Sequence, residues 1–203
     1  MILKAKSCKL KAPPGFSLIE MLVVLTIFLI ITGVILANLP SFRDKTALEL
    51  IAQEIAVTIR QAQVYGIGTR SSGAAFSSHG LAFPYMPGTD NKFFVVFADI
   101  NPDGVYSDSY NCAEIDQECV EKFEIRGAAK IASWHGCTTV ADCEQIINDL
   151  IILFRRFYPE ANFGVGSPYS HVKILVESTK EPSLQREVVI LNTGQISVID
   201  PNS

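Results

Sequence analysis

Side chains that usually carry catalysis are scarce in this sequence. Its three histidines, His79, His135 and His171, stand far apart and show no metal-ligand spacing. Ser170 and Lys173 have the spacing of a Ser-x-x-Lys motif, but the companion motifs of serine acyl enzymes are missing. The short Gly-x-Gly pairs lack the third glycine of a nucleotide-binding loop. The sequence therefore predicts a protein that is not an enzyme.

Acidic side chains are absent from residues 1–15, which carry four lysines. The rest of the chain has 13 basic against 21 acidic side chains, a net charge of −8. Because phosphate binding needs clustered Lys and Arg, this acidic body argues against a nucleic-acid partner. A basic start, then an apolar run, then an acidic body places the start at the cytoplasmic face of a membrane and the body outside it.

The apolar run covers residues 16–39 and allows three interpretations. A cleaved signal peptide would have an apolar core of about 7–15 residues and a small-x-small cleavage site, whereas this run is longer and ends in Ile35-Leu36-Ala37. A plain transmembrane anchor fits the length, since 24 helical residues at about 1.5 Å each reach about 36 Å. The third interpretation is an anchor that is first trimmed after Gly15.

Glu20 distinguishes these interpretations because it lies inside the apolar run. A carboxylate in a membrane span costs on the order of 2.5–3.5 kcal/mol, so it is usually kept for a partner. The alternative is that Glu20 lies near the headgroups and snorkels into them. The basic, proline-containing leader that precedes Glu20 favours a partner.

The segment Gly15-Phe16-Ser17-Leu18-Ile19-Glu20 closely resembles the processing site of type IV prepilins and type II secretion pseudopilins. The resemblance implies cleavage by prepilin peptidase after Gly15 and N-methylation of Phe16. It also implies that Glu20 pairs with the free N-terminal amine of a neighbouring subunit, since a buried carboxylate is tolerated only when it is paired. The implied partners are other pilin or pseudopilin subunits, the peptidase, and an inner-membrane platform protein with its assembly ATPase.

An amphipathic helix is expected to continue beyond the apolar run. Pro40 should kink or locally melt it. Apolar residues then recur at three- and four-residue steps from Leu48 to Ala62, which predicts a helix that packs on the body and ends near Gly66 or Gly68. We therefore expect three parts: a leader (1–15), a transmembrane and assembly helix (16–39), and a globular domain (40–203) that includes the amphipathic half of the helix.

The body reads as short strands between turns, which predicts an α+β fold: a long N-terminal helix on an antiparallel β-sheet or β-sandwich, as in pilins. By pattern, the body looks most like the H-type minor pseudopilins and FimT-like pilins. A short helix is expected at residues 141–149, and a tight hairpin at Asn192-Thr193-Gly194. The expected strands are residues 73–76, 81–83, 93–99, 120–126, 131–134, 151–157, 172–177, 188–192 and 195–199.

Four cysteines lie in the body: Cys112, Cys119, Cys137 and Cys143. Their spacing is not that of a zinc site, and an even count in an exported body predicts two disulfides with three pairings to choose from. Short loops close most readily, so we favour Cys112–Cys119 and Cys137–Cys143, while crossed pairing stays open.

The segment between residues 99 and 110 matches the first half of a calcium loop. Asp99, Asn101 and Asp103 place oxygens at alternate positions, Gly104 permits a sharp turn, and Asp108 is a further candidate ligand. Tyr110 stands where the bidentate glutamate belongs, and Asn-Pro-Asp-Gly is also an ordinary turn sequence that needs no metal. Calcium is therefore one of two interpretations of this loop.

The leading hypothesis is a structural subunit of a type IV pilus or a type II secretion pseudopilus. It would be a single-pass protein of the inner membrane, with a periplasmic or extracellular C-terminal domain. The alternative is a membrane-anchored adhesin or other binding module that uses the pilin export route. A basic or aromatic surface patch would favour the adhesin.

Overall fold

The computed structural model describes residues 15–201, except residues 69–70, 73–74, 89–90, 109, 111, 113–117, 140 and 165, and the side chains of residues 37–38, 40–41, 71–72 and 75–76. The chain divides into two compact units, Met1–Phe42 and Arg43–Ser203. The first half of the helix lies in the first unit. The second half and both sheets lie in the second.

One helix, α1, runs over Leu18–Ile67. The Met21 amide donates to the Ser17 carbonyl at 3.2 Å at its start, and the Gly68 amide donates to the Val64 carbonyl at 2.9 Å at its end. The predicted end is thus confirmed. The expected local melting at Pro40 is wrong, because α1 is helical through this position. A proline removes only one helical N–H donor, and the turns on either side keep α1 helical here.

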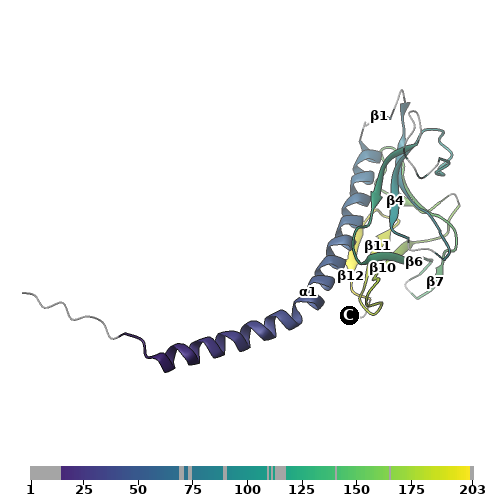
Figure 1. Ribbon diagram of the computed structural model, residues 1–203. Helices are drawn as coiled ribbons and strands as arrows, with labels where there is room; N and C mark the ends of the chain where they lie inside the picture. Colours follow the sequence, from purple (N-terminus) through teal and green to yellow (C-terminus); the bar gives the residue numbers. More distant parts are fainter. Residues whose placement is uncertain are drawn as a thin grey trace, which may run out of the picture. The chain divides into compact units, whose positions relative to one another are not determined.

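Two five-stranded antiparallel sheets make up most of the second unit (Figure 1). Their strand orders are β12-β11-β10-β6-β7 and β5-β4-β3-β8-β9, and a separate two-stranded ribbon pairs β1 with β2. The strands are β1 (Ser71–Ser72), β2 (Ala75–Phe76), β3 (Ser78–Phe83), β4 (Phe93–Asp99), β5 (Cys119–Glu124), β6 (Ala129–Cys137), β7 (Cys143–Gln145), β8 (Leu150–Phe154), β9 (Ala161–Asn162), β10 (His171–Ser178), β11 (Gln185–Leu191) and β12 (Ile196–Ile199). This is the predicted α+β class.

The expected strands correspond to observed ones, although their bounds differ and residues 73–74 lie outside the described part. The predicted C-terminal hairpin is confirmed: the Gly194 amide donates to the Leu191 carbonyl at 2.9 Å, and the Leu191 amide to the Gln195 carbonyl at 2.9 Å. The helix expected at residues 141–149 is wrong. Cys143–Gln145 form strand β7 instead, because β7 pairs with β6 and a disulfide fixes Cys143 opposite Cys137.

The main core lies between the second half of α1 and the two sheets. The buried helix side chains follow the predicted stripe: Leu48, Ile51, Ala52, Ile55, Ala56, Ile59 and Ala62. Strand β10 contributes alternate residues, Val172, Ile174 and Val176, as a half-buried strand should. The end of the helix approaches β8 so closely that a Cβ at Gly66 would lie 2.6 Å from the Phe154 carbonyl oxygen. Only glycine fits there.

Ion pairs at the edge of this core also join α1 to the sheet. The Arg186 Nε on β11 lies 2.6 Å from Glu49 Oε2, and Arg186 Nη1 lies 3.0 Å from Asp200 Oδ2. The hydrogen bond from Arg186 is the largest cause that lowers the pKa of Glu49. Because these groups are partly exposed, each pair adds only about 0–1 kcal/mol. Apolar burial therefore dominates the attachment of the helix.

The sheet formed by β5, β4, β3, β8 and β9 also buries its second face. Val95 and Phe97 on β4 alternate with Phe94 and Val96, which belong to the main core. With Ala82, Leu153 and Tyr106, they form a second, smaller core. Tyr106 comes from the long connection between β4 and β5. This connection therefore covers the second face of the sheet.

We expect Ile55→Ala to destabilise the body by about 2–5 kcal/mol, because the side chain is 1% exposed and its loss leaves a cavity in the main core. Val57→Ala is the matched control: it lies on the same helix with 57% exposure and should change stability by less than about 0.5 kcal/mol. Urea unfolding of the detergent-solubilised chain measures both. Equal effects would show that the helix stripe is not part of the core.

Candidate functional site

The N-terminal candidate site consists of a short exposed segment and the first turn of α1. Gly15, Phe16 and Ser17 precede the helix, and all three are exposed. An exposed, non-helical segment before a helix is open to a peptidase. Glu20 lies in the first helical turn and is also exposed. Residues 1–14 of the expected leader lie outside the described residues.

The helix that follows has an uncovered apolar surface. Leu18–Leu36 has a mean hydropathy of 2.8, none of this window is buried, and it is long and apolar enough to cross a membrane. Glu20 is the only charged residue among residues 16–39. Thr26 satisfies its own hydroxyl by donating to the Leu22 carbonyl at 2.8 Å. Glu20 is therefore the residue of this segment whose charge calls for an outside partner.

A second candidate site lies where the connection between β4 and β5 begins and ends. Asp99 ends β4, Asp103 lies in the following turn, and Glu118 directly precedes β5. One carboxylate oxygen from each lies within 4.8 Å of the other two. Asp99 and Glu118 are buried, whereas Asp103 is exposed. The structure thus groups two residues expected from sequence with one that sequence analysis missed.

The other two expected ligands have hydrogen bonds that shape the loop. Asn101 Nδ2 donates to Asp103 Oδ2 at 3.0 Å, and Asp108 Oδ2 accepts the Glu118 amide. The Gly104 amide donates to Asp99 Oδ1 at 3.3 Å, and Gly104 has a φ of +76°, which glycine adopts without strain. Asp108 is not one of the three clustered carboxylates. Glu118, rather than Asp108, is the third carboxylate of the cluster.

Burial is the largest cause that raises the pKa of both Asp99 and Glu118. The charge of Asp103 raises both further, while hydrogen bonds from Gly104 and Ser107 act in the opposite direction on Asp99 and Glu118, respectively. The positive charge of Arg155 lowers the pKa of Asp99. Near neutral pH the cluster therefore holds negative charge that its surroundings solvate poorly.

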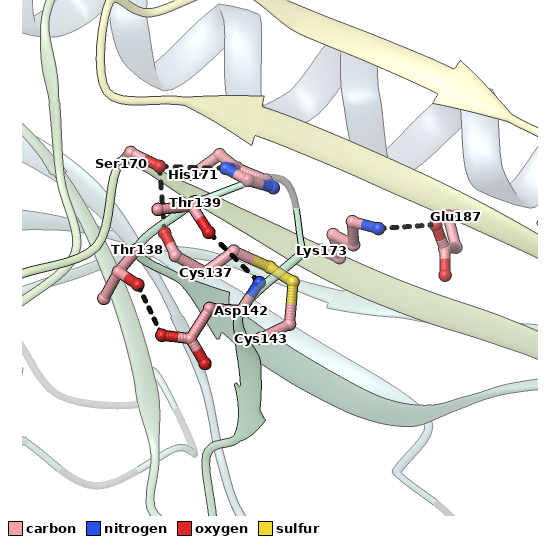
Figure 2. The surroundings of a disulfide bond; sticks show 9 residues. All are labelled: Cys137, Thr138, Thr139, Asp142, Cys143, Ser170, His171, Lys173 and Glu187. Carbon is pink, nitrogen blue, oxygen red and sulfur yellow. Dashed lines mark hydrogen bonds and ion pairs between the residues drawn. A yellow bond between two sulfur atoms is a disulfide. The ribbon is translucent and has the colours of Figure 1, made fainter.

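The four body cysteines form the two favoured disulfides. Cys112 is bonded to Cys119, with their Cα atoms 5.3 Å apart, and Cys137 is bonded to Cys143, with theirs 4.0 Å apart. Figure 2 shows the second bond beside Asp142, which accepts from the Thr138 hydroxyl at 2.9 Å. Both bonds close short loops, so each constrains the unfolded chain less than a bond across a long loop would.

Two groups of side chains near the Cys137–Cys143 bond could be mistaken for a zinc site and for a catalytic Ser-Lys pair. His171 lies near both sulfurs, but a disulfide leaves no thiolate to bind zinc. Ser170 Oγ bonds the Cys137 carbonyl at 3.0 Å, and Lys173 Nζ lies 3.8 Å from Glu187 Oε2 (Figure 2). The Ser170 hydroxyl and the Lys173 ammonium each point to a different partner. Ser170 and Lys173 therefore do not form a catalytic pair.

Comparison with known proteins gives a family match for the N-terminal segment. Residues 14–36 match the family described as the prokaryotic N-terminal methylation motif. The match begins just before Gly15 and covers the apolar part of α1, including Glu20. Residues 14–36 therefore carry the N-terminal methylation motif that the resemblance to type IV prepilins predicts. This motif, together with the uncovered apolar helix that it includes, supports a structural subunit of a pilus or pseudopilus, and the helix fits a membrane anchor.

Two crystal forms of the type IV minor pilin FimU of Pseudomonas aeruginosa are similar to this chain. The first is 12% identical with a TM-score of 0.46, covering 80% of this chain and 95% of FimU. The second is 11% identical with a TM-score of 0.42, covering 76% of this chain and 94% of FimU. No conclusion about the partners of this chain follows from a similarity this low. The sequence has no significant match among curated proteins.

The acidic cluster predicts that the stability of the metal-free chain depends on pH. A folded-state pKa above the unfolded value means that the folded chain binds more protons between the two values, so stability falls as pH rises through that window. We expect the free energy of unfolding in EDTA to decrease from about pH 4 upward, and Glu118→Gln to flatten this decrease. Urea unfolding at several pH values measures it, and a slope that is unchanged in Glu118→Gln would contradict the assignment.

Proposed function

We propose that this pilin is cleaved after Gly15, is methylated on Phe16, and assembles through the first half of α1. The observation that carries the proposal is an uncovered apolar helix with a single carboxylate, which lies within the matched motif. Cleavage would leave a new α-amine on Phe16. This amine is the nearest cation that a packed assembly of such helices would offer to Glu20.

Before assembly, the same helix would hold the pilin in the inner membrane. The four lysines of residues 1–15 would stay cytoplasmic, and the acidic, disulfide-containing body would lie outside, where disulfides persist. In this arrangement prepilin peptidase removes the basic leader, and a platform protein with an assembly ATPase moves the pilin into the filament. Other pilin or pseudopilin subunits would be its direct neighbours.

The anchor and the filament contact would use one surface in two environments. In the membrane, lipid covers the apolar side chains of Leu18–Leu36; in the filament, helices of other subunits cover them. Glu20 is costly in the first environment and useful in the second, provided that an amine lies beside it. This difference favours transfer from lipid into the filament.

The mature pilin should begin at Phe16 and carry one N-methyl group. Extraction from membranes, followed by N-terminal peptide mass analysis, measures both features. The same peptide from cells without prepilin peptidase is the control and should retain residues 1–15. An intact Met1 in peptidase-containing cells, or a start near Asn38, would contradict the proposal.

Glu20→Ala should leave membrane insertion intact, because it removes a carboxylate that costs on the order of 2.5–3.5 kcal/mol in a span. Incorporation into filaments should fall at least about tenfold, since breaking a buried ion pair costs about 3–5 kcal/mol. The readout is the ratio of filament-associated to membrane-associated protein.

Thr26→Ala is the matched control for this experiment. Thr26 lies on the same exposed helix segment, and its hydroxyl is already satisfied by the Leu22 carbonyl, so its loss should leave the ratio unchanged. A normal ratio for Glu20→Ala would remove the role proposed for Glu20.

A further inference from the structure

The connection between β4 and β5 is closed at its base by acidic side chains. Asp99 is the last residue of β4, and Glu118 directly precedes β5. The Ala98 amide donates to the Glu118 carbonyl at 2.8 Å, which brings these ends together. Asp103 reaches the same point from the turn, so the three carboxylates converge within 4.8 Å. Like charges at this separation repel one another, most strongly where burial keeps water away.

The buried oxygen of Glu118 points to a missing ligand. Glu118 is 6% exposed, and its Oε2 accepts the Ser107 amide at 3.1 Å. Its Oε1 is buried and has no hydrogen-bond partner in the part of the chain described. A buried carboxylate oxygen without a donor is strongly unfavourable, so native proteins usually satisfy it with a partner, water or an ion.

Among the described residues, no Lys or Arg side chain forms an ion pair with this cluster. Arg155 acts on Asp99 only through its longer-range charge, and its own side chain is exposed. Among the ion pairs of the described residues, none joins Lys or Arg to Asp99, Asp103 or Glu118. A cation that enters from solvent would relieve the repulsion between the three carboxylates and would also give Glu118 Oε1 a partner.

We propose that Asp99, Asp103 and Glu118 bind a calcium ion at the base of the β4–β5 connection. Carboxylate oxygens are the ligands that calcium prefers, and it accepts irregular arrangements completed by water. Magnesium demands a near-ideal octahedron and keeps most of its waters, so this half-buried, asymmetric set suits calcium better. This site is separate from the N-terminal one and does not depend on the filament role.

The backbone around the cluster is held in place for such a ligand. The Cys112–Cys119 disulfide lies next to Glu118, and Gly104 and Asn101 fix the turn that carries Asp103. Preorganised ligands lose less freedom on binding. A bound calcium would then join the two ends of the connection that covers the second face of the sheet, and so stabilise this face.

The test uses the full chain in detergent, from which EDTA has removed bound metal ions. This chain is titrated with terbium, an ion that binds at calcium sites. Bound terbium emits light when a nearby aromatic ring is excited. Tyr106 is buried in this loop directly before Ser107, whose amide donates to Glu118 Oε2 at 3.1 Å, so Tyr106 is the aromatic residue next to the site along the chain. We expect terbium emission that calcium displaces with a Kd on the order of 0.1–1 mM, as in extracellular calcium modules.

Three variants decide the ligand set. Glu118→Gln should weaken calcium binding at least about tenfold, and Asp103→Asn, at an exposed position that the core does not need, should weaken it in the same direction. Glu121→Gln is the matched control on the exposed side of β5 and should change nothing. At 10 mM calcium the melting temperature of the unchanged chain should rise by about 3–11 °C.

The proposal is overturned by three results: no terbium emission, affinity for calcium that Glu118→Gln and Asp103→Asn leave unchanged, or tighter binding of magnesium than of calcium. If Glu118→Gln does not fold, Asp103→Asn alone decides, because its side chain is exposed.

Discussion

The nineteen helical residues Leu18–Leu36 present an apolar surface of which nothing is buried within the chain. Such a surface cannot stay in water, because each fully exposed large apolar side chain forgoes about 1.5–3 kcal/mol of burial. Lipid and neighbouring helices are the two coverings that suit an unbroken apolar helix. The organisation of the chain follows from this requirement: the first half of α1 is left uncovered by the chain, and the second half packs on the body.

The second half of α1 differs from the first in where its apolar residues point. Ile55 and Ile59 are buried against the two sheets, while Val57 and Val64 on the same helix are exposed. This stripe is narrow enough for one face to be covered by the sheets. In the first half, the four consecutive residues 22–25 point to all sides of the helix axis, and all four are exposed. This is the pattern of a helix surrounded by apolar neighbours.

The sequence was informative where a pattern is local. The motif around Gly15 and Glu20, the helix stripe, the strand alternation of β10 and the short-range disulfides all depend on residues a few positions apart. The strand at Cys143–Gln145 was missed because its partner β6 and the disulfide to Cys137 decide its conformation, rather than its own propensities.

Glu118 was missed for a related reason. It lies 15 positions beyond Asp103, outside the twelve-residue spacing of a calcium loop, and only the pairing of β4 with β5 brings it back to Asp99. The sequence signal that could have found it is its place next to Cys119, since a short disulfide loop at the start of a strand fixes its neighbour. Asn101 and Asp108, the other two expected ligands, are not among the three clustered carboxylates, and their side chains make hydrogen bonds within the loop.

The most direct test of the division of α1 is site-specific photo-crosslinking in cells. A photoreactive residue at Val24, in the uncovered half, should crosslink to the N-terminal helix of another pilin-type subunit, and only when prepilin peptidase is present. The same residue at Ile147, an exposed position of the body, serves as the comparison. Crosslinks from Ile147 to such subunits, with none from Val24, would contradict assembly through the first half of the helix.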